Sequence, residues 1–141
     1  MMHTIVENFC LYYKEFNQDS IAGLDSIYDQ NVIFEDPIRK VEGLNHLKHH
    51  FRTMMSNVSY CRFEITDVVA NDGQAFITWT MNFAHPKLNS HKEIIVTGVS
   101  ELKFDKRITY HRDYFDLGRM FYEQVPILKT IIKALKKRLV A

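Results

Sequence analysis

The spacing of the hydrophobic residues changes at about residue 60, and this change limits the folds open to the chain. Before it, apolar residues recur every three or four positions, as on one side of a helix. After it they alternate with polar residues in runs separated by turns, of which Asn71-Asp72-Gly73 is the clearest. Helices followed by an antiparallel meander predict an α+β fold, with the helices packed on one face of a curved sheet.

The helical pattern occurs in three segments before residue 60. We expect helices over residues 4–17, 20–28 and 44–55. The T-x-x-E spacing from Thr4 favours a helix start at that residue, and Asp19 or Ser20 would cap the second helix. Residues 39–43 have the composition of a turn.

The strands are predicted from alternation and from turn residues. One strand ends at Phe34, a hairpin joins the run that begins at Cys61 to residues 75–83, and two longer strands follow over 92–104 and 107–115. A loop at residues 85–89 separates the hairpin from the last two strands.

The end of the first strand directs a carboxylate toward the core. Successive strand residues point to opposite faces, so with Val32 and Phe34 inward Asp36 also points inward, while Glu35 faces solvent. An inward carboxylate indicates a polar site in an apolar surrounding. The alternative is that Asp36, which precedes Pro37, ends the strand by accepting hydrogen bonds from nearby backbone N–H groups.

Chain length and targeting signals bound the organisation of the protein. At 141 residues the chain fits one domain with a substantial core, which we assign to 1–118, with 119–141 as a helical extension of it. The N-terminal residues lack the pattern of a secretory signal, and no stretch approaches the roughly 18 apolar residues that span a bilayer. A cytoplasmic location is the expectation.

Net charge, cysteines and histidines argue against a nucleic-acid partner, a disulfide framework and a metal site. The net charge of +1 is close to neutral, which argues against a nucleic-acid partner. Cys10 and Cys61 offer neither a disulfide framework nor metal-type spacing, so we expect two reduced, buried thiols. His46, His49 and His50 lie close together on the third helix, and two of them, His46 and His50, share a face because they are four residues apart. No third ligand for these two is evident, so a solvated helix face is favoured over a metal site.

The last fifteen residues or so form a basic amphipathic segment. Leucine and isoleucine recur on one helical stripe, Pro126 suits the first turn, and five cations with no acid accompany them. Three interpretations remain open. The helix packs across the open end or side of the domain, docks on a partner subunit, or lies on an anionic membrane, with a solvated polar face in any of them.

The order of elements, with the segments FEDP and YHRDYFD, resembles the nuclear transport factor 2-like superfamily over roughly residues 4–116. This superfamily includes ketosteroid isomerases, SnoaL-like polyketide cyclases and limonene-epoxide hydrolases. The resemblance implies a cone: a curved antiparallel sheet wrapped around helices, with an apolar pocket at the wide end. It also implies a homodimer that pairs through the outer face of the sheet.

The ketosteroid isomerase pattern matches part of the chain. In that family the EDP segment carries the aspartate that acts as general base, and Asp36 stands in the matching place. An ungapped count places the oxyanion-hole tyrosine at Tyr12 and a supporting tyrosine at Tyr28. The family's second donor, a protonated aspartic acid, falls on Ser100, a weaker donor.

The epoxide hydrolase pattern matches elsewhere. The strand HRDYFD resembles one whose aspartate activates water, so Asp113 takes that position. The arginine and second aspartate of that family's site should come from the strand containing TWTMNF, which has neither. The chain therefore holds one acid from each of two relatives.

The residues themselves suggest how these acids combine. With His111, Asp113 and Phe115 on the inner face of the last strand, Asp36 and Asp113 could meet in one apolar cavity. The other residues predicted to surround it are Tyr12, Tyr28, Trp79, Met81 and Ser100. Burial and mutual repulsion raise carboxyl pKa values, which favours acid-base chemistry. Core packing of the aromatic residues and a structural ion pair at Asp113 are the plain alternatives.

These observations lead to one functional hypothesis and two alternatives. The hypothesis is cofactor-free proton transfer on a small apolar carbonyl compound, giving isomerisation or cyclisation, with Asp36 as base, Asp113 or His111 as partner acid and Tyr12 as donor. The alternatives are a non-catalytic module that binds a small molecule or forms a dimer, and an epoxide-hydrolase-like activity.

Overall fold

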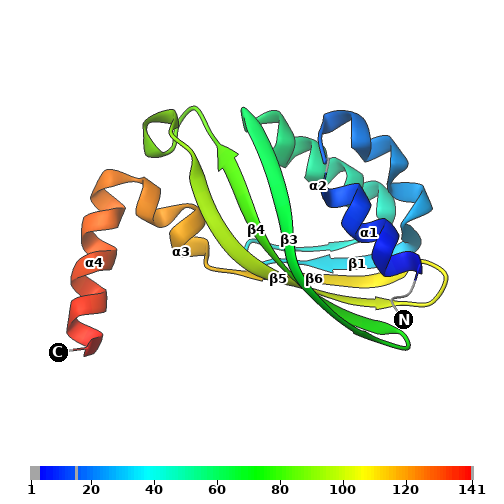
Figure 1. Cartoon of the computed structure of the whole chain (residues 1–141). Coiled ribbons are helices and arrows are strands. Elements are labelled where there is room, and N and C mark those ends of the chain that lie inside the picture. The colour runs from blue at the N-terminus through cyan, green and yellow to red at the C-terminus, as the bar shows by residue number, and fades with distance from the viewer. Residues whose placement is uncertain (1–3, 15, 141) are drawn as a thin grey trace.

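The computed structural model describes residues 4–14 and 16–140, in which three helical segments cover one face of a curved sheet and a last helix stands apart (Figure 1). The α-helices are α1 (Thr4–Lys14), α2 (Leu44–Ser56), α3 (Leu117–Met120) and α4 (Pro126–Val140). Short 3-10 helices are η1 (Gln18–Ser26), η2 (Asn89–His91) and η3 (Tyr122–Gln124). The strands are β1 (Tyr28–Glu35), β2 (Lys40–Glu42), β3 (Tyr60–Asn71), β4 (Gln74–Ala84), β5 (Ile94–Phe104) and β6 (Ile108–Phe115).

The six strands form one open sheet in the order β2-β1-β6-β5-β4-β3. β3 to β6 make the predicted antiparallel meander, and the turn at Asp72-Gly73 places Gly73 at φ +88°. β1 joins its far edge by pairing parallel to β6, with Phe34 beside His111. The predicted α+β fold is confirmed, and this pairing brings the end of β1 next to the strand that carries Asp113.

Three local predictions were wrong in detail. The first helix does not reach Asn17, because the Asn17 side chain accepts a hydrogen bond from the N–H of Asp19 and caps η1. Tyr28, predicted to lie on the second helix, opens β1 instead. The predicted turn at residues 39–43 contains the short strand β2, which pairs antiparallel with the end of β1.

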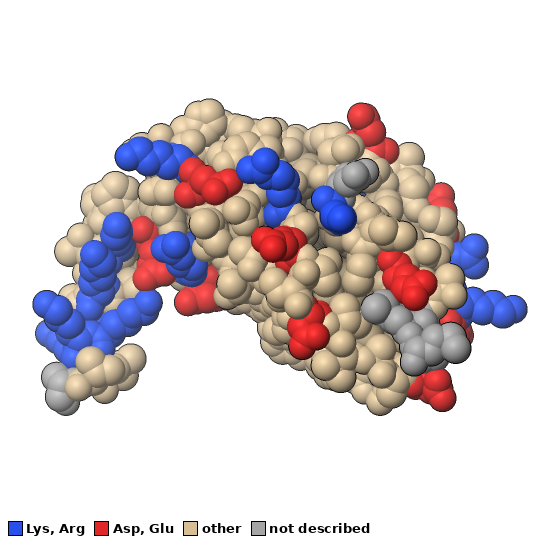
Figure 2. Space-filling view, in the orientation of Figure 1, with Lys and Arg blue, Asp and Glu red and all other residues tan. Residues whose placement is uncertain are grey.

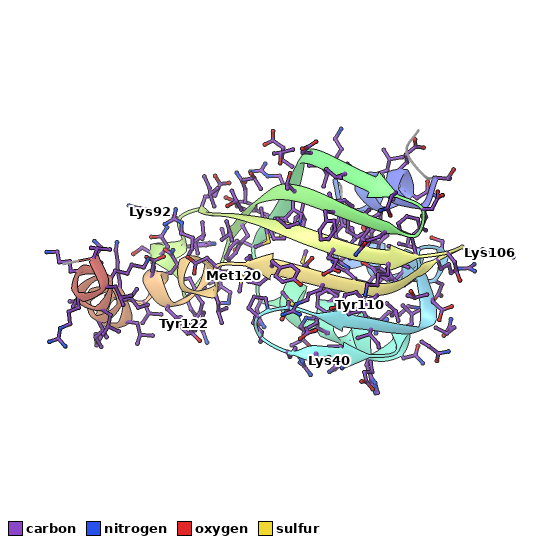
Figure 3. The ribbon with its side chains drawn as sticks, turned by 90° about the horizontal axis from the view of Figure 1, so that it is seen from below. Lys40, Lys92, Lys106, Tyr110, Met120 and Tyr122 are labelled. Atoms are coloured by element: carbon purple, nitrogen blue, oxygen red, sulfur yellow. The ribbon has the colours of Figure 1, made fainter. Side chains whose placement is uncertain are left out.

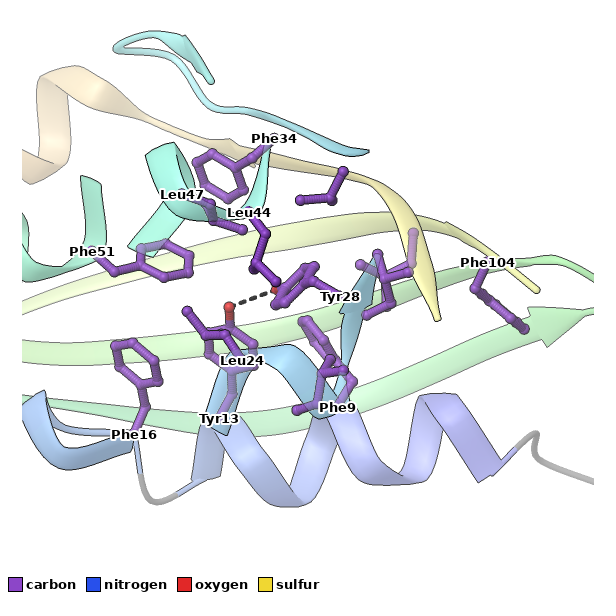
Figure 4. Packing of buried hydrophobic residues seen from close by; sticks show 14 of the residues in the cluster. Phe9, Tyr13, Phe16, Leu24, Tyr28, Phe34, Leu44, Leu47, Phe51 and Phe104 are labelled. Atoms are coloured by element: carbon purple, nitrogen blue, oxygen red, sulfur yellow. Dashed lines mark hydrogen bonds between the residues drawn. The ribbon is translucent and has the colours of Figure 1, made fainter. Parts of the chain in front are cut away.

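The core lies between the helices and the concave face of the sheet, and aromatic side chains fill much of it (Figure 4). Tyr13 stacks on Phe16 and meets Phe51 and Phe63 edge to face. Burial of such rings contributes roughly 2–3 kcal/mol each to folding. Cys10 and Cys61 are free thiols, and each is partly buried rather than fully buried as predicted.

The C-terminal helix α4 is set apart from the rest of the chain. Figure 3 shows it joined to the sheet through the segment that carries Met120 and Tyr122. None of its residues is buried, and it packs mainly against η3. Of the three interpretations, packing across the open end of the domain is therefore wrong. Within the described residues, no helix has the length and hydrophobicity needed to cross a membrane.

Candidate active site

A cavity of about 70 Å³ lies between the concave face of the sheet and the helices α1 and α2. Apart from Tyr13 and two carboxylates, Asp36 and Asp113, its wall is apolar. The remaining lining residues are Phe16, Phe34, Phe51, Met54, Met55, Cys61, Phe63, Trp79, Met81, Phe115 and Met120. The structure thus places Asp36 and Asp113 on the wall of a single apolar chamber.

Asp113 is held by two short hydrogen bonds on one of its oxygens. Its Oδ1 lies 2.6 Å from Nε2 of His111 and 2.5 Å from the Ser100 hydroxyl, which donates to it. His111 precedes it by two residues on the same face of β6, and Ser100 is its cross-strand partner on β5. Among the described residues Oδ2 has no hydrogen-bond partner, so this oxygen is available to a bound molecule.

The network continues behind these two residues into the core. The indole N–H of Trp79 donates to the Ser100 oxygen at 2.9 Å, and Nδ1 of His111 lies 2.7 Å from the Tyr28 hydroxyl. Tyr28 in turn lies 2.7 Å from the hydroxyl of Tyr13 (Figure 4). Six side chains from α1 and four strands are therefore linked, and the cross-sheet register sets their order.

The hydrogen-bond directions in this network are consistent with an ionised Asp113. An indole can only donate, so the Ser100 proton is free to go to the carboxylate. A neutral His111 that donates from Nε2 accepts at Nδ1 from Tyr28, whose oxygen accepts from Tyr13. Burial raises the pKa values of Tyr13 and Tyr28 well above the usual range, so both remain neutral donors. Each proton in the network then points toward Asp113.

Asp36 has a different surrounding, in which its charge is already matched. Its Oδ1 accepts from the backbone N–H groups of Ile38, at 2.8 Å, and Arg39, at 3.0 Å, and Oδ2 lies 3.5 Å from Nε2 of His50. Burial raises the pKa of Asp36, but the adjacent His50 and the two backbone donors lower it by more. Asp36 both lines the cavity and ends its strand, so the two interpretations of this residue hold together.

The histidines of α2 divide between surface and core. His50, predicted to lie on a solvated helix face, is buried, and its ring packs against Phe34 and Phe51. His46 is exposed, and its ring lies 2.9 Å from the backbone oxygen of Glu42. Within the described part of the chain, no group of three or more His, Cys, Asp or Glu side chains is placed to hold a metal ion.

The remaining predicted site residues fall into two groups. Trp79, Met81 and Phe115 line the cavity, whereas Tyr28, Ser100 and His111 lie behind the wall and reach it only through Asp113 or Tyr13. Tyr12 is displaced from the wall, because its hydroxyl donates to the backbone oxygen of Ser20 in η1. Burial also raises the pKa of Tyr12 to about 12.

Sequence reasoning missed Tyr13 and three methionines of the wall, Met54, Met55 and Met120. The spacing of Val6, Phe9 and Tyr13 along α1 was a usable signal, because it places Tyr13 on the buried stripe and Tyr12 beside it. Cys61 was singled out only as a thiol; it lines the cavity, and burial raises its pKa to about 12, which keeps it protonated.

A second cavity of about 230 Å³ adjoins the first and is wider. The two share five lining residues, Met54, Met55, Cys61, Met81 and Met120, and Ile38 and Phe121 stand at the outer rim. Methionine side chains are unbranched and change rotamer readily. Rotation of these four methionines would join the chambers into a space of the size that small ligands occupy, about 300 Å³ or more.

The Asp36→Asn variant should be less stable than the native protein by about 1–2 kcal/mol at neutral pH, because a buried charged acceptor is lost. Since its pKa is lower in the folded state than its ordinary value of 3.8, ionised Asp36 stabilises the fold above that pH. The contribution is lost as the pH falls through the folded-state pKa. Urea unfolding of both proteins at pH 7 and at about pH 3 measures the difference.

Asp67→Asn is the matched control, because Asp67 is exposed and bonds only the neighbouring N–H of Val68. It should change stability by less than about 0.5 kcal/mol at either pH. A deficit in Asp36→Asn that stays constant down to low pH would contradict an ionised Asp36.

Comparison with known proteins places the fold. A SnoaL-like domain model matches residues 11–111, so the chain belongs to the SnoaL-like domain family. A search of curated proteins gave no match. The fold is similar to an NTF2-like protein of unknown function from Burkholderia pseudomallei K96243, with a TM-score of 0.77 and 13% identity over 88% of this chain and 99% of that one.

Two further solved structures connect the fold to the relatives expected from the sequence. A SnoaL-like protein from Shewanella putrefaciens CN-32 has a TM-score of 0.73 and 20% identity, over 90% of this chain and 99% of that one. An LEH-like epoxide hydrolase from M. tuberculosis has a TM-score of 0.67 and 19% identity, over 92% and 93%. At these identities the likeness shows a common fold and no common activity.

Proposed function

We propose that the protein is a cofactor-free acid-base catalyst that moves a proton on a small apolar carbonyl compound, with Asp113 as the base. The observation that carries this proposal is the hydrogen-bond network that converges on Oδ1 of Asp113 at the wall of an apolar cavity. The side chain of Asp113 is 20% exposed, whereas His111 behind it is 1% exposed, so the carboxylate meets the cavity and its support does not.

Asp113 is a better base than Asp36 because one of its carboxylate oxygens is free, within the described part of the chain, to take a proton. Asp36 already accepts two backbone hydrogen bonds and lies beside His50, which lowers its pKa and its affinity for a proton. Asp113 has one oxygen fixed by His111 and Ser100 and the other without a partner among the described residues. We therefore assign the base to Asp113 in place of Asp36, which remains a fixed negative charge on the same wall, at the end of β1 beside β6.

The reaction follows from these positions. Oδ2 of Asp113 takes a proton from the carbon next to the substrate carbonyl, and the electron pair moves onto the carbonyl oxygen as an enolate. Returning that proton to another carbon isomerises the substrate. In a cyclisation, the enolate carbon instead attacks a second carbonyl, whose oxygen takes the proton. Tyr13, the one hydroxyl among the lining residues, replaces Tyr12 as the donor to the enolate oxygen, and its proton then turns from the Tyr28 oxygen to the substrate.

The apolar wall serves this chemistry in two ways. It binds a hydrophobic substrate, and it excludes water from the carboxylate, so the electrostatic effect of each hydrogen bond is stronger than in solvent. The β4 residues on the wall, Trp79 and Met81, supply no arginine or acid. This composition favours proton transfer over the epoxide-hydrolase alternative.

Deuterium uptake tests the proposal without knowledge of the natural substrate. A panel of small apolar ketones and β-keto esters is incubated in D2O with and without the protein, and ¹H NMR follows loss of the α-proton signal. We expect uptake that depends on protein for at least one member. The opposite result is that no compound of the panel takes up deuterium, although at least one of them binds in saturation-transfer NMR. That result would support the non-catalytic binding module.

We also propose that two copies pair through the outer, convex face of the sheet, the face that bears Tyr110 in Figure 3. Phe76, Ile95 and Tyr114 are exposed there, on three neighbouring strands. Ile95→Lys should convert a dimer to a monomer in light scattering after size exclusion, because it buries a charge at the contact. Leu11→Lys, at an exposed position of α1 on the opposite face of the sheet, is the control and should leave the mass unchanged. A monomeric native protein would refute the pairing.

A further inference from the structure

The helix α4 presents a hydrophobic surface that the described chain does not cover. At 100° per residue, its six leucines and isoleucines fall within an arc of about 140°. Ile127 is 75% exposed and Leu139 is 85% exposed, and Ile131 and Leu135 between them are exposed as well. Four isolated apolar side chains would need no explanation, but a continuous stripe of them marks a contact surface.

The charge of α4 is opposite to that of the remainder of the chain. The helix carries Lys129, Lys133, Lys136, Lys137 and Arg138 and no acid, so 13 of the 18 basic residues and all 17 acidic residues lie outside it, a net charge of −4 against +5. Figure 2 shows the blue side chains gathered on α4. Lys136 bonds Glu123 at 2.9 Å, and the other four have no acidic partner within residues 4–14 and 16–140.

The end of the molecule that holds α4 is apolar beyond the helix itself. Phe121 and Tyr122, in the segment that leads to the helix, are exposed, and so are Ile38 and Met54, which line the outer cavity. Aromatic side chains at the junction of an apolar and a polar surface are typical of groups that lie at a lipid interface. The cavity entrance and α4 thus belong to one region.

From these observations we propose that α4 lies on the surface of an anionic lipid bilayer, with its leucine and isoleucine arc in the acyl region. The lysines lie on the flanks and back of the helix, and Arg138 falls within the arc, where its long stem can extend to the headgroups. A groove on a protein would contact the apolar arc and leave the charges on the back of the helix without partners. A charged bilayer attracts all five, because its potential extends about 8–10 Å from the surface.

Vesicle flotation tests this proposal on the full chain. We expect the native protein to float with vesicles of phosphatidylcholine and phosphatidylserine, and weakly with phosphatidylcholine alone. Ile131→Ser with Leu135→Ser should lower partitioning at least about thirtyfold by removing apolar burial. The double change Lys133→Gln with Lys137→Gln should lower partitioning onto the anionic vesicles about thirtyfold, because each cation contributes about 1 kcal/mol of attraction to the surface. Since none of these side chains is buried, Trp79 fluorescence should confirm an unchanged fold.

A matched charge control separates docking from general attraction. Lys103→Gln with Lys106→Gln changes the net charge by the same amount at the other end of the sheet, where Figure 3 shows Lys106. This variant should bind as the native protein does. The proposal would be overturned if both lysine pairs lowered binding equally, or if the native protein stayed at the bottom of the gradient with anionic vesicles. It would also be overturned if α4 formed a lipid-independent dimer that the Ile131 and Leu135 changes abolished.

Discussion

Replacing Asp113 by Asn should lower the rate of deuterium uptake by about a thousandfold or more. The amide keeps one oxygen that can accept from Ser100 and His111, as Oδ1 does now, so the geometry of the wall is retained. It cannot take a proton, and removal of a positioned base costs about 10² to 10⁴ in rate. The initial rate of α-proton loss for the best substrate of the panel, measured for both proteins, gives the ratio.

Asp36→Asn is the informative comparison, because it removes the second carboxylate from the same wall. It should retain uptake within about tenfold, since Asp36 holds backbone donors and not the reacting proton. The reverse result, with activity lost in Asp36→Asn and kept in Asp113→Asn, would return the base to the residue that the sequence favoured. Equal retention in both variants would refute a carboxylate base.

The fold was predictable because it depends on short-range periodicity. The alternation from residue 60 determines which side chains of β3 to β6 face the core, and the Asp-Gly turn sets where the first hairpin reverses. The inward position of Asp36 followed from the same parity, and it is buried in the structure. Each of these inferences concerns residues that are neighbours in sequence, where the backbone alone fixes the direction of the side chain.

The site was less predictable because its contacts join distant elements. His50 meets Asp36 only because α2 packs against β1, and three nearby histidines on an amphipathic helix do not show that one of them reaches a carboxylate. The exchange of Tyr12 for Tyr13 has a similar origin. An ungapped count assumes that α1 continues in a given register, whereas Asn17 starts a new 3-10 helix and Tyr12 binds into it.

Asp113 shows where sequence reasoning stops. His111 and Asp113 share a face of β6 by parity, which was foreseen, but the hydrogen bond from Ser100 depends on the register between β5 and β6. That register is set by the turn between the strands and by a shift between Lys103 and Phe104, which periodicity does not encode. Individual strands could be assigned from the sequence, and the pairing that completes the network could not.

The support behind Asp113 also depends on a glycine. Gly98 lies opposite Trp79 on the paired strands β5 and β4, with the indole ring over its Cα. A Cβ at this position would lie 2.6 Å from Cζ2 of Trp79 and 2.8 Å from the backbone oxygen of Tyr114. Neither neighbour can yield easily, because one is a buried ring and the other is main chain. Trp79 can therefore reach Ser100 only while position 98 has no side chain.

Gly98→Ala should lower the free energy of unfolding by about 3 kcal/mol, from overpacking and from loss of the Trp79 hydrogen bond. Since Trp79 is the one tryptophan of the chain, its emission reports the displaced ring during urea unfolding. Gly23→Ala is the matched control, because its Cβ would lie 3.6 Å from the Tyr12 ring, an ordinary contact, and its cost should stay below about 1 kcal/mol. If the two variants were equally stable, Gly98 would not be the residue that makes room for the indole, and the position of Trp79 beside Ser100 would need another cause.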